Sequence, residues 1–302
     1  MKALVFGGAG QDGFYLIEHL IEQGHEVVAT RTRPAALLPP EAREGVRWLW
    51  SDLRDDSMVA SAIVDARPDV VFNLAAVTTP GASWLEPATS DVAEVNAMGA
   101  LRVLRAVERF APSARLVHAS SSAVYDPARY GLYGASKVFA HEAVKGYRSR
   151  GLWAANAVLY SHTSVRQDSR FLVPYVCRAV ARIRAGSVEH VSLRDPGALR
   201  DWMDAADAVR ALVKIAGQAE PGDFDVATGV QLSHRAVVEM ALDGSGLDVA
   251  DVLDGGDGPG YVERPADLRA ILATGWWPGR PLRAVVAEMV QAALTEVKEK
   301  GL

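Results

Sequence analysis

A tyrosine and a lysine four positions apart form the clearest chemical pattern in this chain. Tyr133 and Lys137 open an amphipathic stretch over residues 132–147. Four-residue spacing places two side chains on one face of a helix. An ammonium group beside a phenol favours the phenolate, which lowers the phenol's pKa from about 10 and suits it to proton exchange with a hydroxyl during hydride transfer. The same spacing also arises by chance on surface helices.

A run of serines precedes this pair and makes the pattern more specific. Residues 116–119 are apolar enough to predict a buried strand, and Ser120, Ser121 and Ser122 follow them directly. An α/β sheet places its chemistry at the carboxyl ends of its strands. We therefore expect a serine, the tyrosine and the lysine to converge at one edge of a sheet.

A glycine-rich segment near the start of the chain predicts a dinucleotide site. Gly7, Gly10 and Gly13 stand between a strand pattern and a helical pattern. Their spacing differs from the usual G-x-G-x-x-G, but it meets the same needs: a tight turn, close approach to a pyrophosphate and close packing of helix on strand. The helix that follows offers N–H groups and a partial positive charge to phosphates. The alternative is a glycine-rich turn that binds nothing.

The end of the second predicted strand indicates which dinucleotide binds. An NAD site places an acid there for the ribose 2′-hydroxyl, whereas an NADP site places an arginine. This chain has Arg31 and Arg33 at that point and no acid. Guanidinium groups bind phosphate through two parallel hydrogen bonds, so NADP(H) is favoured over NAD(H). The alternative is that Arg31 and Arg33 are ordinary surface charges. Asp52 is expected at a position where an acid can contact the adenine.

Alternating strand and helix patterns supply the framework for these residues. Strands are predicted at residues 3–6, 26–30, 70–74 and 116–119, with helices at 14–23, 57–66, 92–110 and 132–147. Such alternation predicts an α/β fold with a doubly wound parallel sheet of the Rossmann type. The second half is less regular, with strands predicted at 154–160 and 223–227, helices at 171–185, 205–216 and 281 to about 298, and a loop at 254–260.

These patterns predict two functional parts. Residues 1–160 are expected to form an NADP(H)-binding Rossmann domain that carries the catalytic residues. Residues 161–302 are expected to form mainly a smaller C-terminal substrate-binding lobe, with segments at about 200–230 returning to the Rossmann domain.

Composition excludes several classes of protein. The 302 residues carry a net charge of -5, which argues against a nucleic-acid-binding protein. Cys177 is the only cysteine, so no intramolecular disulfide can form and a cytoplasmic protein is favoured. We expect no signal peptide, membrane span or metal site, because the chain lacks the corresponding apolar runs and ligand spacings. A Ser-His-Asp hydrolase is not supported, since no G-x-S-x-G motif is present.

An ordered series of motifs resembles the extended short-chain dehydrogenases of the NAD-dependent epimerase/dehydratase family, and within them the GDP-mannose 4,6-dehydratases. The resemblance covers nearly the whole chain. The matching segments are residues 7–13, 73–76, 95–99, 133–137, 162–171, 200–202, 227–229, 264–265 and 275–276.

The resemblance implies roles for individual residues. Tyr133 would transfer the proton, Lys137 would hold the nicotinamide ribose, and Ser121 would bind the sugar 4-hydroxyl. The implied cofactor-binding residues are Gly7, Gly10, Gln11, Asp12, Gly13, Arg31, Arg33, Asp52, Leu53, Leu74, Ala75 and Ala76, together with Tyr133 and Lys137. The implied substrate-binding residues are Ser83, Ser122, His162, Arg166, Arg200 and Arg264.

Two of these matches carry structural alternatives. For His162, the alternative is a hydrogen-bonded structural role. Arg200 and Arg264 match arginines that bind a nucleotide diphosphate. Asn96 matches a position near the active-site helix, and a capping or buried polar role explains it equally well.

The chain also departs from the family pattern. A dehydratase has a glutamate two residues after the active-site serine or threonine, and this chain has Ala123. Loss of such an acid–base group typically costs about two to four powers of ten in rate. Only eleven residues separate Ser121 from Tyr133, which predicts a more open pocket. Ser161 and Tyr175 also replace the asparagine and lysine of the nucleotide-gripping loop.

These observations predict an NADP(H)-dependent enzyme that acts on a nucleotide sugar by hydride transfer, as a 4-keto reductase or an epimerase. One alternative is a GDP-mannose 4,6-dehydratase-like enzyme in which Asp126 or another group replaces the missing glutamate. Another is a non-catalytic NADP(H)-binding sensor, although the retained Tyr133 and Lys137 argue against it. The helices at 92–110 and 132–147 resemble those that form a four-helix interface in family dimers, so a homodimer is expected.

Overall fold

The computed structural model describes residues 1–32, 45–78, 88–186, 190–256, 258 and 260–300. The predicted site residues Arg33 and Ser83 lie outside these ranges. The chain divides into two compact units. Unit 1 comprises Met1–Leu159, Ala208–Val226 and Asp267–Trp276, and unit 2 comprises Tyr160–Asp207, Ala227–Ala266 and Trp277–Leu302. The sequence patterns did not predict that the segment Asp267–Trp276 belongs to unit 1.

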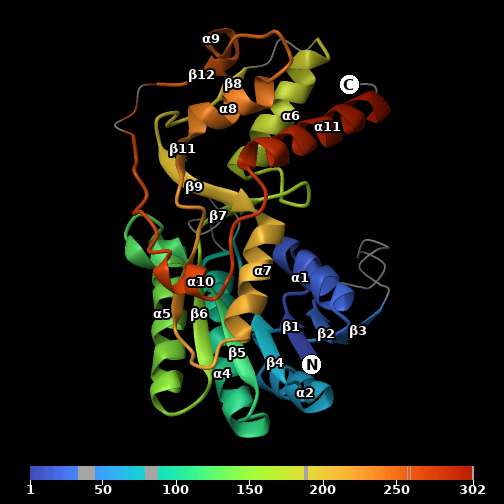
Figure 1. Cartoon of the computed structure of the whole chain (residues 1–302), viewed down its shortest axis with the longest axis vertical. Coiled ribbons are helices and arrows are strands. Elements are labelled where there is room, and N and C mark those ends of the chain that lie inside the picture. Colours follow the sequence, from blue (N-terminus) through green and yellow to red (C-terminus); the bar gives the residue numbers. More distant parts are fainter. Residues whose placement is uncertain (33–44, 79–87, 187–189, 257, 259, 301–302) are drawn as a thin grey trace. The chain divides into compact units, whose positions relative to one another are not determined.

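Unit 1 is built on a seven-stranded sheet in the order β10-β6-β5-β4-β1-β2-β3, with every pair parallel (Figure 1). The strands are β1 (Lys2–Phe6), β2 (Glu26–Arg31), β3 (Val46–Trp50), β4 (Val70–Asn73), β5 (Arg115–Ser121), β6 (Ala154–Leu159) and β10 (Asp223–Val226). The predicted doubly wound sheet is therefore confirmed. Central strands are buried on both faces, which explains their apolar runs.

Strand β3 was missed because its sequence lacks such a run. It lies at the edge of the sheet, where Arg47 and Trp50 are exposed. An edge strand needs no continuous apolar stretch, since one side of it faces solvent.

Helices cover both faces of this sheet. A single core joins α2 (Asp56–Ala66), α4 (Gly99–Phe110) and α5 (Gly131–Ser149) to the strands. On the other face, α1 (Gln11–Glu22) runs beside α7 (Ala205–Ala216), and Figure 1 shows these two helices next to each other. The short helix α10 (Arg269–Ala273) completes the unit.

The helix expected over residues 92–110 is divided into three parts. It consists of α3 (Ala88–Asp91), a π-helix over Val92–Met98 and then α4. Within the π-helix, Asn96 is buried, accepts from Val77 N at 2.7 Å and donates to Val77 O at 3.1 Å. It also donates to Ser136 Oγ of α5 at 3.3 Å. Asn96 is therefore a buried polar residue that also contacts α5, so both alternatives given for it agree with the structure.

Unit 2 has a second core around small sheets. The three-stranded sheet has the order β11-β9-β7, with β7 (Ser161–Thr163), β9 (Leu199–Asp204) and β11 (Gln231–Ser233), and β8 (Val191–Ser192) pairs with β12 (Leu253–Asp254). The helices are α6 (Leu172–Arg184), α8 (His234–Leu242), α9 (Val249–Val252) and α11 (Leu282–Lys300).

Cys177 lies within the core of unit 2. Burial raises the pKa of its thiol to about 12, so it packs as a small apolar side chain. Within the described ranges, no helix is both long and apolar enough to cross a bilayer.

Candidate active site

The glycine-rich loop connects β1 to α1 and is shaped by two crowded positions. Gly7 has a φ of 82°, and a Cβ there would lie 2.7 Å from Ala75 N. A Cβ on Gly13 would overlap Gly7 O, because real Cβ atoms do not approach an oxygen so closely. The first glycine therefore allows the turn, and the last allows α1 to pack against the loop.

Gly10 differs from these two glycines because its surroundings are open. A Cβ there would meet only Gly7 O, at 3.4 Å. Gly10 is the N-cap of α1 and makes no side-chain cap, so the start of the helix keeps its backbone accessible. Beside it, Gln11 Nε2 donates to Asp12 Oδ1 at 3.0 Å. An open backbone at a helix N-terminus fits a pyrophosphate group.

The residues after β4 lie against this loop. Leu74 N donates to Phe6 O at 3.0 Å, which extends the pairing of β4 with β1. Ala75 then approaches Gly7 closely, and Ala76 is half-buried beside it. The structure thus brings together two of the predicted cofactor-binding segments.

The predicted 2′-phosphate end of the site centres on Arg31, the last residue of β2. Its guanidinium carbon lies 5.6 Å from the centre of the Trp50 ring, in cation–π range. Arg31 and Trp50 are opposite each other in the β2–β3 register, so the strand pairing itself places the ring beside the guanidinium.

Asp52 and Leu53 follow β3 and have partners within the protein. The Asp52 carboxylate accepts from Arg54 Nε at 3.1 Å and from Arg54 NH2 at 2.6 Å, and the side-chain hydrogen bond from Arg54 lowers the pKa of Asp52. The Leu53 side chain is buried in the core, so only its backbone remains for a ligand.

Helix α5, which carries the predicted catalytic pair, begins beside a compact turn. A Cβ on Gly134 would lie 2.5 Å from Pro127 O, so the short segment between Ser121 and Tyr133 packs directly on the first turn of α5. Glycine at position 134 therefore allows this close packing.

Lys137 is buried on α5, one turn after Tyr133. Its Nζ donates to Ala119 O of β5 at 2.8 Å and lies 5.8 Å from the centre of the Tyr133 ring. Burial lowers the pKa of Lys137 to about 8, although the charge of Asp12 acts in the opposite direction.

The pKa of Tyr133 is raised rather than lowered. Burial raises it to about 12, a side-chain hydrogen bond with Ser121 partly offsets this, and the charges of Tyr130 and Asp12 add to the rise. The expectation of a lowered phenol pKa is therefore wrong for this structure, because burial is the largest influence on Tyr133 and raises its pKa. The placement agrees with expectation: Ser121, Tyr133 and Lys137 converge, and Asp12 acts on both titrating groups.

Ala123 lies in the short 3-10 helix η5 (Ser122–Tyr125), which Ser121 caps. Ala123 N donates to Ser121 Oγ at 3.2 Å, and the Ala123 side chain is 1% exposed. The two residues after η5's buried part have different surroundings. Tyr125 OH donates to Asp225 Oδ1 at 2.5 Å, whereas Asp126 is exposed. Ser122 is half-buried at the start of η5.

In unit 2, the two predicted gripping arginines lie near each other. Glu263 N donates to Leu199 O at 3.0 Å, which lays the segment carrying Arg264 along the start of β9, where Arg200 stands. Arg200 is 3.9 Å from Glu263 Oε1 and 5.4 Å from the centre of the Tyr261 ring. Arg264 is exposed.

Glu263 was missed by sequence reasoning. It is 2% exposed and accepts from Asp201 N at 3.2 Å. A glutamate before Arg264-Pro265 looks like a solvent-facing charge in the sequence, so no sequence signal identified its burial.

The other predicted substrate residues of unit 2 lie on or after β7. His162 Nδ1 is 2.8 Å from Tyr160 O, and β7 pairs in parallel with β9, so His162 shares a sheet with Arg200. Arg166 is exposed, with its backbone N donating to Ser164 Oγ at 3.2 Å. Tyr175, at the altered position of the gripping loop, accepts from Ser192 N at 3.1 Å.

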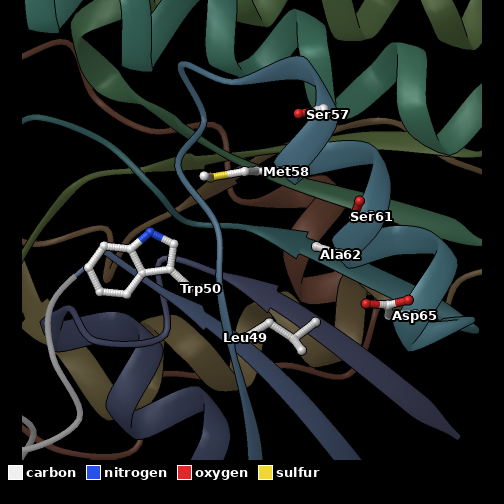
Figure 2. A pocket seen from close by; sticks show the side chains of 7 residues that line it. All are labelled: Leu49, Trp50, Ser57, Met58, Ser61, Ala62 and Asp65. Atoms are coloured by element: carbon white, nitrogen blue, oxygen red, sulfur yellow. The ribbon is translucent and has the colours of Figure 1, made fainter.

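A pocket of about 170 Å³ opens between β3 and α2, away from the residues predicted to carry chemistry. Figure 2 shows Trp50 and Met58 lining one part of it and Leu49 and Asp65 another. Among the residues that the structure describes, no group of three or more His, Cys, Asp or Glu side chains is arranged to hold a metal ion.

Comparison with known proteins gives consistent results. Residues 4–266 match the family described as GDP-mannose 4,6 dehydratase. The chain is 30% identical to a GDP-mannose 4,6-dehydratase of Yersinia enterocolitica, over 100% of this chain and 96% of that enzyme. It is 32% identical to GDP-mannose 4,6 dehydratase of Homo sapiens, over 80% of this chain and 71% of the human enzyme.

A solved structure extends the similarity to the fold. The chain resembles UDP-glucose 4-epimerase of Thermus thermophilus in complex with NAD, with a TM-score of 0.81 and 25% identity. The match covers 97% of this chain and 99% of that one.

Proposed function

Since this chain belongs to the GDP-mannose 4,6-dehydratase family of the extended short-chain dehydrogenases, we propose that it is an NADP(H)-dependent oxidoreductase acting on a nucleotide sugar. The reaction is hydride transfer at a keto or carbinol carbon, as in a 4-keto reductase or an epimerase. The observation that carries this proposal is the convergence of Ser121, Tyr133 and Lys137 beside a buried Ala123.

Tyr133 holds the proton that the reduction of a keto group consumes. A phenol with a pKa of about 12 is neutral at pH 7, so Tyr133 holds a proton that it can donate to a keto oxygen. Ser121 hydrogen-bonds the same oxygen, and Lys137, anchored on Ala119 O, binds the ribose hydroxyls and adds positive charge beside the phenol. A bound nicotinamide supplies the hydride.

The residues around the glycine loop fit NADP(H). The open backbone at Gly10 and the start of α1 suit the pyrophosphate, and Arg31 suits a 2′-phosphate because guanidinium binds phosphate bidentately. Trp50 supports the guanidinium from the neighbouring strand. Leu74, Ala75 and Ala76 border the same loop, which supports a cofactor role for the segment after β4.

The division of labour follows the two units. We assign cofactor binding and proton transfer to unit 1, and recognition of the nucleotide diphosphate to Arg200, Arg264, Arg166 and His162 of unit 2. Exposed apolar side chains on the π-helix, α4 and α5 support a homodimer formed through these helices: Met98, Phe110 and Phe139. The single, buried cysteine supports a cytoplasmic location.

Dehydration is the second candidate, because the family match and both relatives above are GDP-mannose dehydratases. It requires a base in place of Ala123, whose buried methyl group cannot exchange protons. Asp126 is the acid nearest in sequence and is exposed.

Product analysis separates these candidates. Purified protein is incubated with NADPH or NADP⁺ and a panel of nucleotide sugars that includes GDP-mannose and 4-keto-6-deoxy sugars, and products are followed by mass. A gain of two hydrogens on a keto sugar with NADPH consumed is expected. Loss of water from GDP-mannose without net cofactor change would replace this proposal with the dehydratase.

The cofactor assignment has its own control in the same experiment. The Arg31→Gln variant is expected to bind NADPH about tenfold more weakly while NADH binding stays unchanged, because only the 2′-phosphate contact is lost. Equal affinity of the wild-type protein for NADPH and NADH would contradict the assignment.

A further inference from the structure

One face of α5 is attached to β5 at three successive points. Tyr133, Lys137 and His141 follow each other at four-residue intervals, so they share that face. Lys137 Nζ donates to Ala119 O at 2.8 Å, and His141 Nδ1 lies 3.0 Å from Ser120 Oγ. Tyr133 hydrogen-bonds Ser121. Three consecutive residues of β5 thus hold three successive turns of the catalytic helix.

The second nitrogen of His141 is anchored on a carboxylate. His141 Nε2 lies 3.4 Å from Asp223 Oδ2, at the first residue of β10. Asp223 Oδ1 also accepts from Arg148 NH2 at 2.8 Å and from Asn156 Nδ2 at 2.9 Å. Burial raises the pKa of Asp223, but the hydrogen bonds from His141, Asn156 and Arg148 outweigh it and hold the pKa well below its ordinary value.

This anchoring determines the tautomer of His141. An ionised carboxylate only accepts hydrogen bonds, so His141 Nε2 carries the hydrogen that it donates to Asp223. In the neutral ring, Nδ1 is then an acceptor for the Ser120 hydroxyl. The remaining titratable groups nearby are Lys137 and His118, and burial lowers the pKa of His118 well below its ordinary value, so His118 stays neutral.

A serine, a histidine and an aspartate in line raise the question of a nucleophile. Ser120 is 2% exposed, which leaves no room for a substrate. In hydrolytic triads the serine bonds Nε2 and the aspartate bonds Nδ1, and the order here is reversed. The arrangement therefore holds structure in place and does not perform hydrolysis.

We propose that His141 is a positioning residue which, bonded to Ser120 and Asp223, holds α5 on β5 so that Tyr133 remains within hydrogen-bond reach of Ser121. The inference rests on the proposed role of Tyr133 in proton transfer. A displacement of about 1 Å in such a group can cost about a hundredfold in rate, so a modest loosening of α5 has a large catalytic effect.

The test replaces His141 in two ways. In His141→Gln, the amide oxygen and nitrogen share one carbon, as the two ring nitrogens share Cε1, so the amide can accept from Ser120 and donate to Asp223. His141→Leu removes both bonds. Each protein is labelled with 3-fluorotyrosine, and the Tyr133 fluorine resonance, assigned by its loss in Tyr133→Phe, is followed by NMR against pH.

The expected outcome is specific. In His141→Leu the Tyr133 resonance moves in the same direction as in Ser121→Ala, and kcat falls about 10- to 100-fold with KM within about twofold. His141→Gln restores both. Glu142→Leu, a control on the exposed face of the same helix, leaves the resonance where it is in the wild-type protein.

Several outcomes would overturn the proposal. They are an unmoved Tyr133 resonance in His141→Leu, an equal shift in Glu142→Leu, or a His141→Gln variant that behaves like His141→Leu. If His141→Leu does not fold, Ser120→Ala removes only one hydroxyl and must produce the same shift. The fluorine measurement needs no substrate, so failure of every nucleotide sugar to react would contradict the proposed function alone.

Discussion

The proposed proton-transfer site of unit 1 (Ser121, Tyr133 and Lys137) and the proposed arginine site of unit 2 (Arg200 and Arg264) are built in different ways. In unit 1, Ser121 ends a buried parallel strand and Lys137 is buried on the helix that follows. In unit 2, Arg200 stands near the start of β9, which pairs with the three-residue strands β7 and β11. The buried Glu263 holds the segment that carries Arg264 beside β9. The first site depends on the main sheet, and the second on a small sheet and on the backbone and side-chain contacts of Glu263.

The two proposed sites also differ in burial. Desolvation moves the pKa of Tyr133 up to about 12 and that of Lys137 down to about 8. Arg166 and Arg264 are exposed. Changes at Tyr133 should therefore alter kcat, whereas changes at the arginines of unit 2 should alter KM for the nucleotide sugar.

The largest effect is expected for Tyr133→Phe. Removing the hydroxyl takes away the proton donor, so kcat should fall by about two to four powers of ten while NADPH binding is retained. Rates are measured with the substrate found by product analysis, and NADPH binding by calorimetry.

Tyr147→Phe provides the matched control on the same helix. Tyr147 is 8% exposed and belongs to the core, so kcat should stay within about twofold of wild type. Comparable losses in both variants would show that the fold, and not proton transfer, is affected.

The next effect concerns Lys137 and the pH dependence of stability. Its folded pKa of about 8 lies below the ordinary value of 10.5, so the unfolded chain binds more protons between these two pH values. The free energy of unfolding of the wild-type protein should therefore rise from pH 8 to 10.5, by up to about 3 kcal/mol relative to Lys137→Met.

Urea unfolding of both proteins at several pH values measures this difference. Tyr133 lowers the free energy of unfolding only above pH 10, because its folded pKa of about 12 lies above the ordinary value of 10. A constant difference between wild type and Lys137→Met across this range would mean that Lys137 is not desolvated.

The smallest effect is expected in unit 2. Arg200→Gln should raise KM for the nucleotide sugar roughly 10- to 150-fold with kcat nearly unchanged, since a charged hydrogen bond to the ligand contributes about 1.5 to 3 kcal/mol. Glu263→Gln should raise KM less, because it removes a support of Arg200 and not the arginine itself. A fall in kcat without a change in KM would place Arg200 in the chemistry and remove the contrast between the two units.

Sequence patterns predicted the parts of unit 1 that obey strong local rules. Glycines at Gly7 and Gly13 were recognisable because a turn and a close helix approach exclude side chains. The apolar strands were recognisable because both faces are buried. Edge strand β3 was missed because its partial exposure leaves no clear apolar run. The π-helix over Val92–Met98 was missed because the bond between the Asn96 side chain and the Val77 backbone leaves no periodic signal in the sequence.

By itself, the sequence determined the doubly wound sheet, the glycine loop and the one-face spacing of Tyr133 and Lys137, because each follows from local periodicity or from the absence of a side chain. Only the tertiary structure decided the direction of the Tyr133 pKa shift, the burial of Glu263 and the bonds of His141 to Ser120 and Asp223. These depend on desolvation and on contacts between residues far apart in the chain, which spacing along the sequence does not encode.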